Sequence, residues 1–202
     1  NVSSRAMLLP GHGTHPKDLA DKKYEEWMKA IKNELNNIDS KNKFILGYSL
    51  GGTLALNIGE DEDLTGIISI NAPIFLQNKF IPFISILKLV QKYHVKKPED
   101  IILISNKDRV AYDSIPLDTI MEISRGIKQL ELERIEEPVL IIQTKNDTTV
   151  QPRSAKFIFD SINSDKKGIL WLDSSPHGRL FEEEQKITFE EIYRFIEKNS
   201  KL

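Results

Sequence analysis

The sequence contains no cysteine among its 202 residues. This absence excludes disulfide bonds, zinc sites built from thiolates, and a cysteine nucleophile. A chain without cysteine is compatible with the reducing cytosol, and residues 1–5 carry no signal-peptide pattern. We therefore expect a cytoplasmic protein.

An excess of basic residues is also absent. The 28 lysines and arginines are balanced by 30 aspartates and glutamates, which leaves a formal net charge of −2. Without a basic excess the chain has little to neutralise phosphates, so we expect no nucleic-acid partner. No stretch of 18 residues is free of charge, so no membrane-spanning helix is expected.

Apolar runs and helical patterns alternate along most of the chain, which is 40 % hydrophobic. An apolar run at 6–9 stops at Pro10-Gly11, and clearer elements follow it. We expect strands at 44–46, 66–70, 139–143 and 169–172, and helices at 24–38, 50–59, 117–132, 154–162 and 189–197. This alternation predicts a single α/β domain, residues 1–202, with a mostly parallel sheet and helices on both faces.

One insertion, about residues 74–113, is longer than a plain crossover between strands. Its first part, residues 74–90, is apolar and aromatic, but Pro82 and interspersed lysines exclude a membrane span. We interpret the segment as a small cap that supplies the apolar wall of a pocket. An ordinary core helix is the alternative, and residues 101–104 fit either a helix or a strand.

The motif Gly47-Tyr48-Ser49-Leu50-Gly51-Gly52 follows the apolar run Phe44-Ile45-Leu46. A strand that ends in Gly-x-Ser-x-Gly and turns into a helix is typical of a nucleophile elbow, in which a strained turn exposes the serine hydroxyl. The N–H of Leu50, at the start of the helix, would point at a developing oxyanion. A glycine-rich turn without chemistry is the alternative.

An acid and a histidine follow Ser49 in the order found in α/β hydrolases. Asp147 comes directly after an expected strand, where its carboxylate could accept a histidine N–H and fix the tautomer. A turn or helix cap is the alternative role, and Asp165 and Asp173 are competing acids. Of the four histidines only His177 lies after both Ser49 and Asp147, although a histidine on a turn is usually a surface residue.

Two further histidines, His12 and His15, lie in one early loop. They could suggest a metal pair, but the only nearby acid is Asp18, and such a site needs more ligands. We favour a loop that shapes the site. No metal ion and no organic cofactor is expected.

Several of these motifs occur together in a known superfamily. They are Leu9-Pro10-Gly11-His12-Gly13-Thr14, the elbow, Ile70-Asn71-Ala72-Pro73, the strand 138–143 with Asn146-Asp147, and Ser175-Pro176-His177. With them the chain resembles the α/β hydrolases, in particular the small bacterial and archaeal carboxylesterases and monoacylglycerol lipases. Many relatives have Ser-Gly-His where this chain has Ser-Pro-His.

The resemblance implies a serine esterase. Ser49 would be the nucleophile, His177 the general base and Asp147 the acid that orients it, while the Leu50 N–H would donate to the oxyanion. The substrate would be a small-molecule ester, with a short to medium acyl chain or a monoacylglycerol; the oligomeric state is not indicated. Only 48 residues precede Ser49, so we expect early strands, and the loop with the second oxyanion donor, to lie outside this sequence.

Three alternatives remain at this stage. The same triad could serve a thioesterase or a peptidase, because one fold hosts many acyl-transfer reactions. A non-catalytic binding protein could retain the pocket without turnover. Residues 74–90 could also form a docking face of an interaction protein.

Overall fold

The computed structural model describes residues 2–78, 91–95 and 112–200. Most of the expected cap, including residues 79–90 and 101–104, lies outside the described residues. The chain divides into two compact units. The first is Asn1–Asp39 with Pro82–Arg125, and the second is Ser40–Ile81 with Gly126–Leu202.

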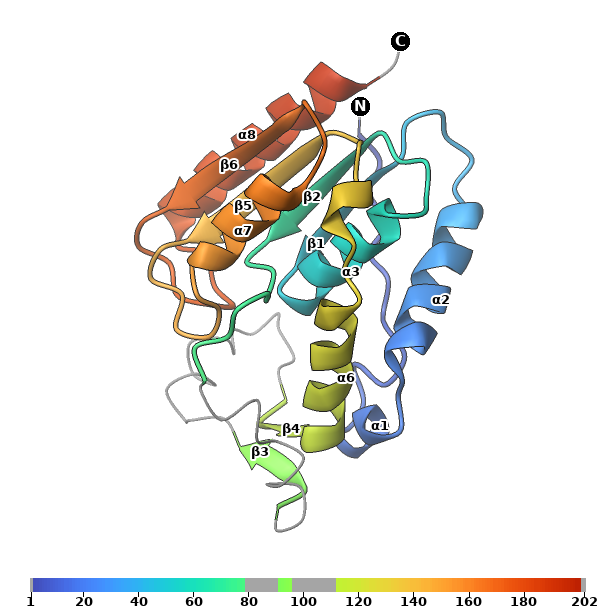
Figure 1. The fold of residues 1–202 in the computed structure, drawn as a ribbon, viewed down its shortest axis with the longest axis vertical. Helices are drawn as coiled ribbons and strands as arrows, with labels where there is room; N and C mark the ends of the chain where they lie inside the picture. The colour runs from blue at the N-terminus through green and yellow to red at the C-terminus, as the bar shows by residue number, and fades with distance from the viewer. Residues whose placement is uncertain (1, 79–90, 96–111, 201–202) are drawn as a thin grey trace. The chain divides into compact units, whose positions relative to one another are not determined.

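The second unit contains a four-stranded parallel sheet (Figure 1). Its strands are β1 (Phe44–Tyr48), β2 (Gly66–Ile70), β5 (Val139–Thr144) and β6 (Lys167–Leu172), in the order β1-β2-β5-β6. Every residue of β2 and β5 is buried. The two central strands are largely apolar, as expected where helices cover both faces of the sheet.

Helices α3 (Leu50–Gly59) and α7 (Arg153–Ser161) cover one face, and α8 (Glu182–Asn199) covers the other (Figure 1). Between α8 and the sheet lies an apolar cluster, which comprises Ile68, Ile70, Leu140, Ile142, Leu172 and Ile192. A short 3-10 helix, Leu132–Arg134, precedes β5. These layers fix the carboxyl ends of the strands, where the loops with the candidate site residues begin.

The first unit contains α1 (Lys17–Ala20), α2 (Tyr24–Asn36), an antiparallel hairpin of β3 (Tyr93–Val95) and β4 (Ser114–Pro116), and the beginning of α6 (Leu117–Lys128). The Glu122 carboxylate accepts the N–H of Tyr24 (3.1 Å) and pairs with Lys23 (3.3 Å). It thus satisfies an N–H at the start of α2 that has no partner within the helix.

The structure confirms the predicted α/β class and the four parallel strands. The last helix, however, begins at Glu182 rather than at 189. The prediction began too late because residues 182–186 are polar and show no apolar periodicity, although acidic residues suit the first turn of a helix. Helix α6 ends at Lys128 rather than at 132. Residues 6–9 lie in no strand. Among the residues that the structure describes, no helix is long and apolar enough to cross a bilayer.

Candidate active site

The strained turn expected at Ser49 is present between β1 and α3. Ser49 has φ 52° and ψ −119°, a region that residues with a side chain rarely adopt. Its N–H donates to the carbonyl of Ile70 (2.8 Å), which ties the turn to β2. A Cβ on Gly47 would lie 1.9 Å from the carbonyl oxygen of Gly51. Only glycine therefore permits α3 to leave the strand this closely.

Three side chains meet at the carboxyl ends of β1, β5 and β6. The Oγ of Ser49 lies 2.9 Å from Nε2 of His177, and Nδ1 of His177 lies 2.7 Å from Oδ2 of Asp147. The Asp147 side chain is fully buried, and 12 % of the His177 side chain is exposed. The three residues predicted from the sequence thus form one continuous hydrogen-bonded chain.

The Asp147 carboxylate is held at both oxygens. Oδ1 accepts the N–H groups of Thr149 (2.8 Å) and Val150 (2.7 Å), while Oδ2 faces His177. The bond to Thr149 is an Asx turn, so the alternative role considered for Asp147 is present as well. With one oxygen anchored by the main chain, the other is aimed at the imidazole.

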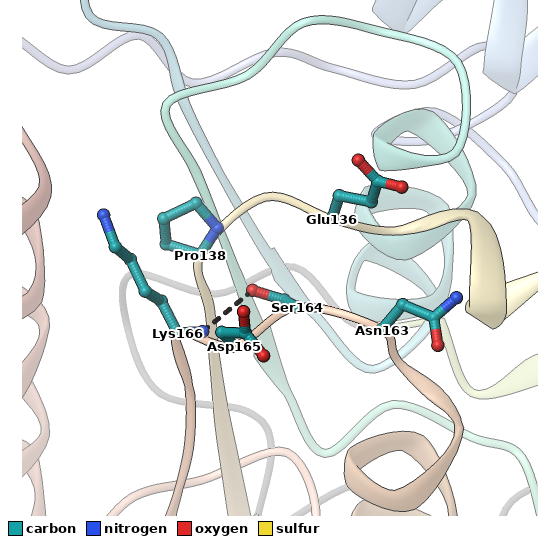
Figure 2. Close-up of a pocket in the computed structure, with 6 residues that line it drawn as sticks. All are labelled: Glu136, Pro138, Asn163, Ser164, Asp165 and Lys166. Atoms are coloured by element: carbon teal, nitrogen blue, oxygen red, sulfur yellow. Dashed lines mark hydrogen bonds between the residues drawn. The ribbon is translucent and has the colours of Figure 1, made fainter.

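The competing acids lie elsewhere. The Asp173 side chain is 74 % exposed and pairs with Lys145 at 2.6 Å. Asp165 precedes β6 and therefore lies at the opposite edge of the sheet from His177. There it helps to line a cavity of about 450 Å³ (Figure 2).

That cavity is not near the reacting groups. Its walls are Glu136, Pro138, Asn163, Ser164, Asp165 and Lys166, which surround the amino ends of β5 and β6 (Figure 2). One contact across this turn is the Lys166 N–H donating to Ser164 Oγ (3.1 Å). Because Ser49 and His177 lie at the carboxyl ends of their strands, a substrate bound in this cavity would not reach them.

Comparison with known proteins points to the same class of enzyme as the geometry of these three side chains. A sequence model of the family described as serine aminopeptidase, S33, matches residues 6–184. The chain belongs to this family of α/β hydrolases. The predicted fold and the predicted superfamily are thereby confirmed.

Relatives of this S33-family chain resemble it along almost its whole length. A carboxylesterase of Bacillus subtilis is 24 % identical over an alignment of 201 positions, which covers 96 % of this chain and 80 % of the relative. A thermostable monoacylglycerol lipase of a Bacillus species (strain H-257) is 29 % identical over an alignment of 203 positions, which covers 95 % of this chain and 78 % of the relative. A solved structure from work on the metagenome-derived lipolytic enzymes LipS and LipT has a TM-score of 0.82 at 26 % identity, covering 94 % of this chain and 80 % of that one.

Two residues of this S33-family chain to which the sequence interpretation gave no role, Tyr48 and Asn71, form hydrogen bonds near His177. The Tyr48 hydroxyl accepts N–H bonds from the Asn71 side chain (3.0 Å) and from Gly178 (2.9 Å). Asn71 has φ 48°, and its Oδ1 accepts the N–H of Thr144 (2.9 Å). Asn71 therefore links the ends of three strands. The available signals were its place in the Asn-Ala-Pro motif and the position of Tyr48 directly before Ser49.

A buried acid, Glu184, lies on the other side of the histidine turn. Its carboxylate accepts the N–H groups of Asp173 (2.7 Å), Ser174 (2.8 Å) and Ser175 (2.8 Å), and the Ser175 hydroxyl. Burial alone would raise the pKa of the Glu184 carboxyl, but these hydrogen bonds outweigh it and hold the pKa below its usual value. Sequence interpretation missed Glu184 because it is one of three consecutive glutamates.

The expected oxyanion donor is the first N–H of α3. Leu50 begins this helix, and within the described ranges its N–H donates to no acceptor. Two later donors of the first turn, the N–H groups of Gly52 (2.8 Å) and Thr53 (3.2 Å), bind the carbonyl of Ser49. The role of Leu50 stays a prediction.

The loop with His12 and His15 belongs to the first unit. Burial lowers the pKa of His12, whose ring packs edge-on against Trp27. His15 Nδ1 accepts the N–H of Lys17 at 3.1 Å. In the described parts of the chain, no group of three or more His, Cys, Asp or Glu side chains could hold a metal ion.

Proposed function

We propose that this chain hydrolyses carboxylic esters through an acyl-enzyme on Ser49, with His177 and Asp147 completing a catalytic triad. The observation that carries the proposal is the unbroken hydrogen-bonded chain Ser49–His177–Asp147, 2.9 Å and 2.7 Å long, on a strained turn. The relatives named carboxylesterase and monoacylglycerol lipase support ester substrates.

The first half-reaction forms the acyl-enzyme. Ser49 Oγ attacks the ester carbonyl carbon while His177 Nε2 takes its proton. Asp147 accepts the Nδ1–H and stabilises the imidazolium that results. The tetrahedral oxyanion accepts the Leu50 N–H. When the intermediate collapses, the C–O bond breaks and the alcohol leaves with the proton from His177.

The second half-reaction releases the acid. Water gives a proton to His177 and attacks the acyl carbon, and Ser49 regains its proton as the carboxylic acid departs. None of these steps needs a metal ion or an organic cofactor. We propose esters of short to medium acyl chains, or monoacylglycerols, as substrates. We also propose a cytoplasmic location, based on the lack of cysteine, which cell fractionation would test.

A second candidate is peptide-bond hydrolysis at the same serine, because the family is described as serine aminopeptidase. The triad itself serves both reactions. Amino-acid p-nitroanilides would measure this activity beside the esters. Preference for the anilides by kcat/KM would replace the ester proposal with the peptidase.

The deciding experiment measures hydrolysis of p-nitrophenyl esters, from acetate to laurate, and of monoacylglycerols. The wild-type chain is compared with Ser49→Ala, for which we expect a loss of kcat of about 10⁴-fold or more. A fluorophosphonate probe should label Ser49 in the wild type. A folded wild-type chain that neither turns over any substrate nor reacts with the probe would instead indicate a non-catalytic binding protein.

A further inference from the structure

The turn between β6 and α8 carries His177. Besides its contacts with Ser49 and Asp147, this turn is held by hydrogen bonds on both sides of the histidine. After the histidine, the N–H of Gly178 donates to the Tyr48 hydroxyl (2.9 Å). Before the histidine, residues 173–175 lie against Glu184 from the first turn of α8.

Glu184 makes an unusual number of bonds to this segment. Its Oε1 accepts two N–H groups, from Asp173 and Ser174, and its Oε2 accepts the N–H and the hydroxyl of Ser175. The Ser175 hydroxyl in turn accepts the N–H of Phe181 (2.8 Å), so both ends of the turn are joined. The Glu184 carboxylate thus accepts four hydrogen bonds, three from main-chain N–H groups and one from a hydroxyl.

Charge and burial show why a carboxylate suits this place. Glu184 is 8 % exposed, and Ser175 is fully buried. Only an ionised carboxylate offers two oxygens that both accept without donating. A glutamine would turn an N–H₂ group toward one set of N–H donors, and a buried donor left without an acceptor is costly. The neighbouring Glu182 and Glu183 are exposed, and the N–H groups of residues 173–175 donate to Glu184 instead.

We propose that Glu184 is a positioning residue for catalysis: by gripping residues 173–175 it holds His177 within hydrogen-bonding distance of Ser49 and Asp147. The proposal rests on the esterase function proposed above. It places no part of Glu184 in contact with substrate. A displacement of a catalytic group by about 1 Å can lower a rate by about 10²-fold. Loss of the hydrogen bonds from Glu184 should therefore lower kcat and leave substrate binding unchanged.

The test compares Glu184→Gln with Glu183→Gln. Both changes remove one negative charge from the first turn of α8, but only one disturbs the histidine turn. We expect Glu184→Gln to lower kcat about 10- to 100-fold with KM within about twofold of the wild type. Glu183→Gln should keep the wild-type kcat. Circular dichroism at the assay temperature checks that both variants are folded.

A spectroscopic readout separates positioning from general stability. The low-field proton NMR signal of the hydrogen between His177 Nδ1 and Asp147 should be present in the wild type and in Glu183→Gln. In folded Glu184→Gln it should be broadened or lost. Equal kcat values and equal signals in the two variants would overturn the proposal.

If Glu184→Gln does not fold, Ser175→Ala takes its place, since it removes one of the four bonds and should lower kcat about fivefold; an unchanged kcat would overturn the positioning role. If the folded wild type hydrolyses no ester, the esterase proposal fails. The NMR comparison then still decides whether Glu184 orders His177.

Discussion

At the scale of single residues, two aspartates near the histidine turn have opposite surroundings. Asp147 is buried and contacts His177, whereas the Asp173 side chain is exposed and pairs with Lys145. We expect Asp147→Asn to lower kcat by about 10⁴-fold, because the amide favours the wrong imidazole tautomer. Asp173→Asn should change kcat less than about threefold, since exposed ion pairs contribute little. Ester hydrolysis measures both, and the reverse ranking would identify Asp173 as the acid.

The two glycines that bracket the elbow motif also differ. A Cβ on Gly47 would collide with the main chain of Gly51, whereas a Cβ on Gly51 would meet nothing within 4 Å. We expect Gly47→Ala to lower the free energy of unfolding by about 3 kcal/mol or more. Gly51→Ala should be neutral or stabilising by up to about 1 kcal/mol, because alanine favours the helix.

Urea unfolding followed by circular dichroism measures both glycine variants. The two variants carry the same added methyl group, so each serves as the control for the other. Equal destabilisation would mean that the close approach of α3 to β1 does not decide the choice of residue at 47.

At the scale of secondary-structure elements, the C-terminus of α3 carries a half-buried acid. Burial raises the pKa of Glu60 to about 7, and the nearby carboxylates of Glu131 and Asp61 add to the effect. Hydrogen bonds from the Glu131 N–H (2.8 Å) and the Asn57 side chain (2.7 Å) oppose it. A negative charge at this end of a helix is also unfavourable.

The sign of the pH effect follows from these pKa values. Between pH 4.5, the ordinary value, and about 7 the folded chain keeps a proton on Glu60 that the unfolded chain loses. Stability therefore falls as the pH rises through this window. We expect Glu60→Gln to be more stable than the wild type by about 1 kcal/mol at pH 8, allowing for solvent screening, and nearly equal to it at pH 5.

Thermal unfolding at the two pH values measures this difference. Asp63→Asn is the matched control, because Asp63 is exposed and lies only three positions away. The same gain at pH 5 and pH 8 for Glu60→Gln would show that the buried charge is not its cause.

Elements with a strong local pattern were predictable, and those that depend on partners were not. The apolar runs at 66–70 and 139–143 correspond to β2 and β5 almost residue for residue. The first two turns of α8 were missed because residues 182–186 are all polar and give no apolar periodicity, and the three glutamates among them look alike in sequence. Only folding distinguishes them, by burying Glu184 beneath the histidine turn. The short α1 and the β3–β4 hairpin carry too few residues for a periodic signal.

At the scale of the whole molecule, the candidate site is assembled from residues far apart in sequence. Ser49 and His177 are 128 positions apart, yet their side chains are hydrogen-bonded. The order of the motifs was enough to predict this meeting, because parallel strands bring their carboxyl ends to one edge. The contacts of Tyr48 and Asn71 were not predictable, since they depend on which strands are neighbours.

The sheet that carries this site depends on its central core. Ile142 is fully buried in β5 in the cluster under α8, whereas Ile187 of α8 is 49 % exposed. We expect Ile142→Ala to lower the free energy of unfolding by about 2–5 kcal/mol, through lost burial and the cavity it leaves. Ile187→Ala should change it by about 0.5 kcal/mol or less. Urea unfolding tests both, and comparable losses would contradict this placement of the core.

The grip of Glu184 on the histidine turn has a consequence for how such chains diverge. Three of its four bonds come from main-chain N–H groups, which every residue except proline possesses. Over evolutionary time the side chains at 173 and 174 can drift without loosening the turn. The acid at 184 has no such freedom. In distantly related sequences, we expect the conserved pattern to be a histidine followed seven positions later by a glutamate.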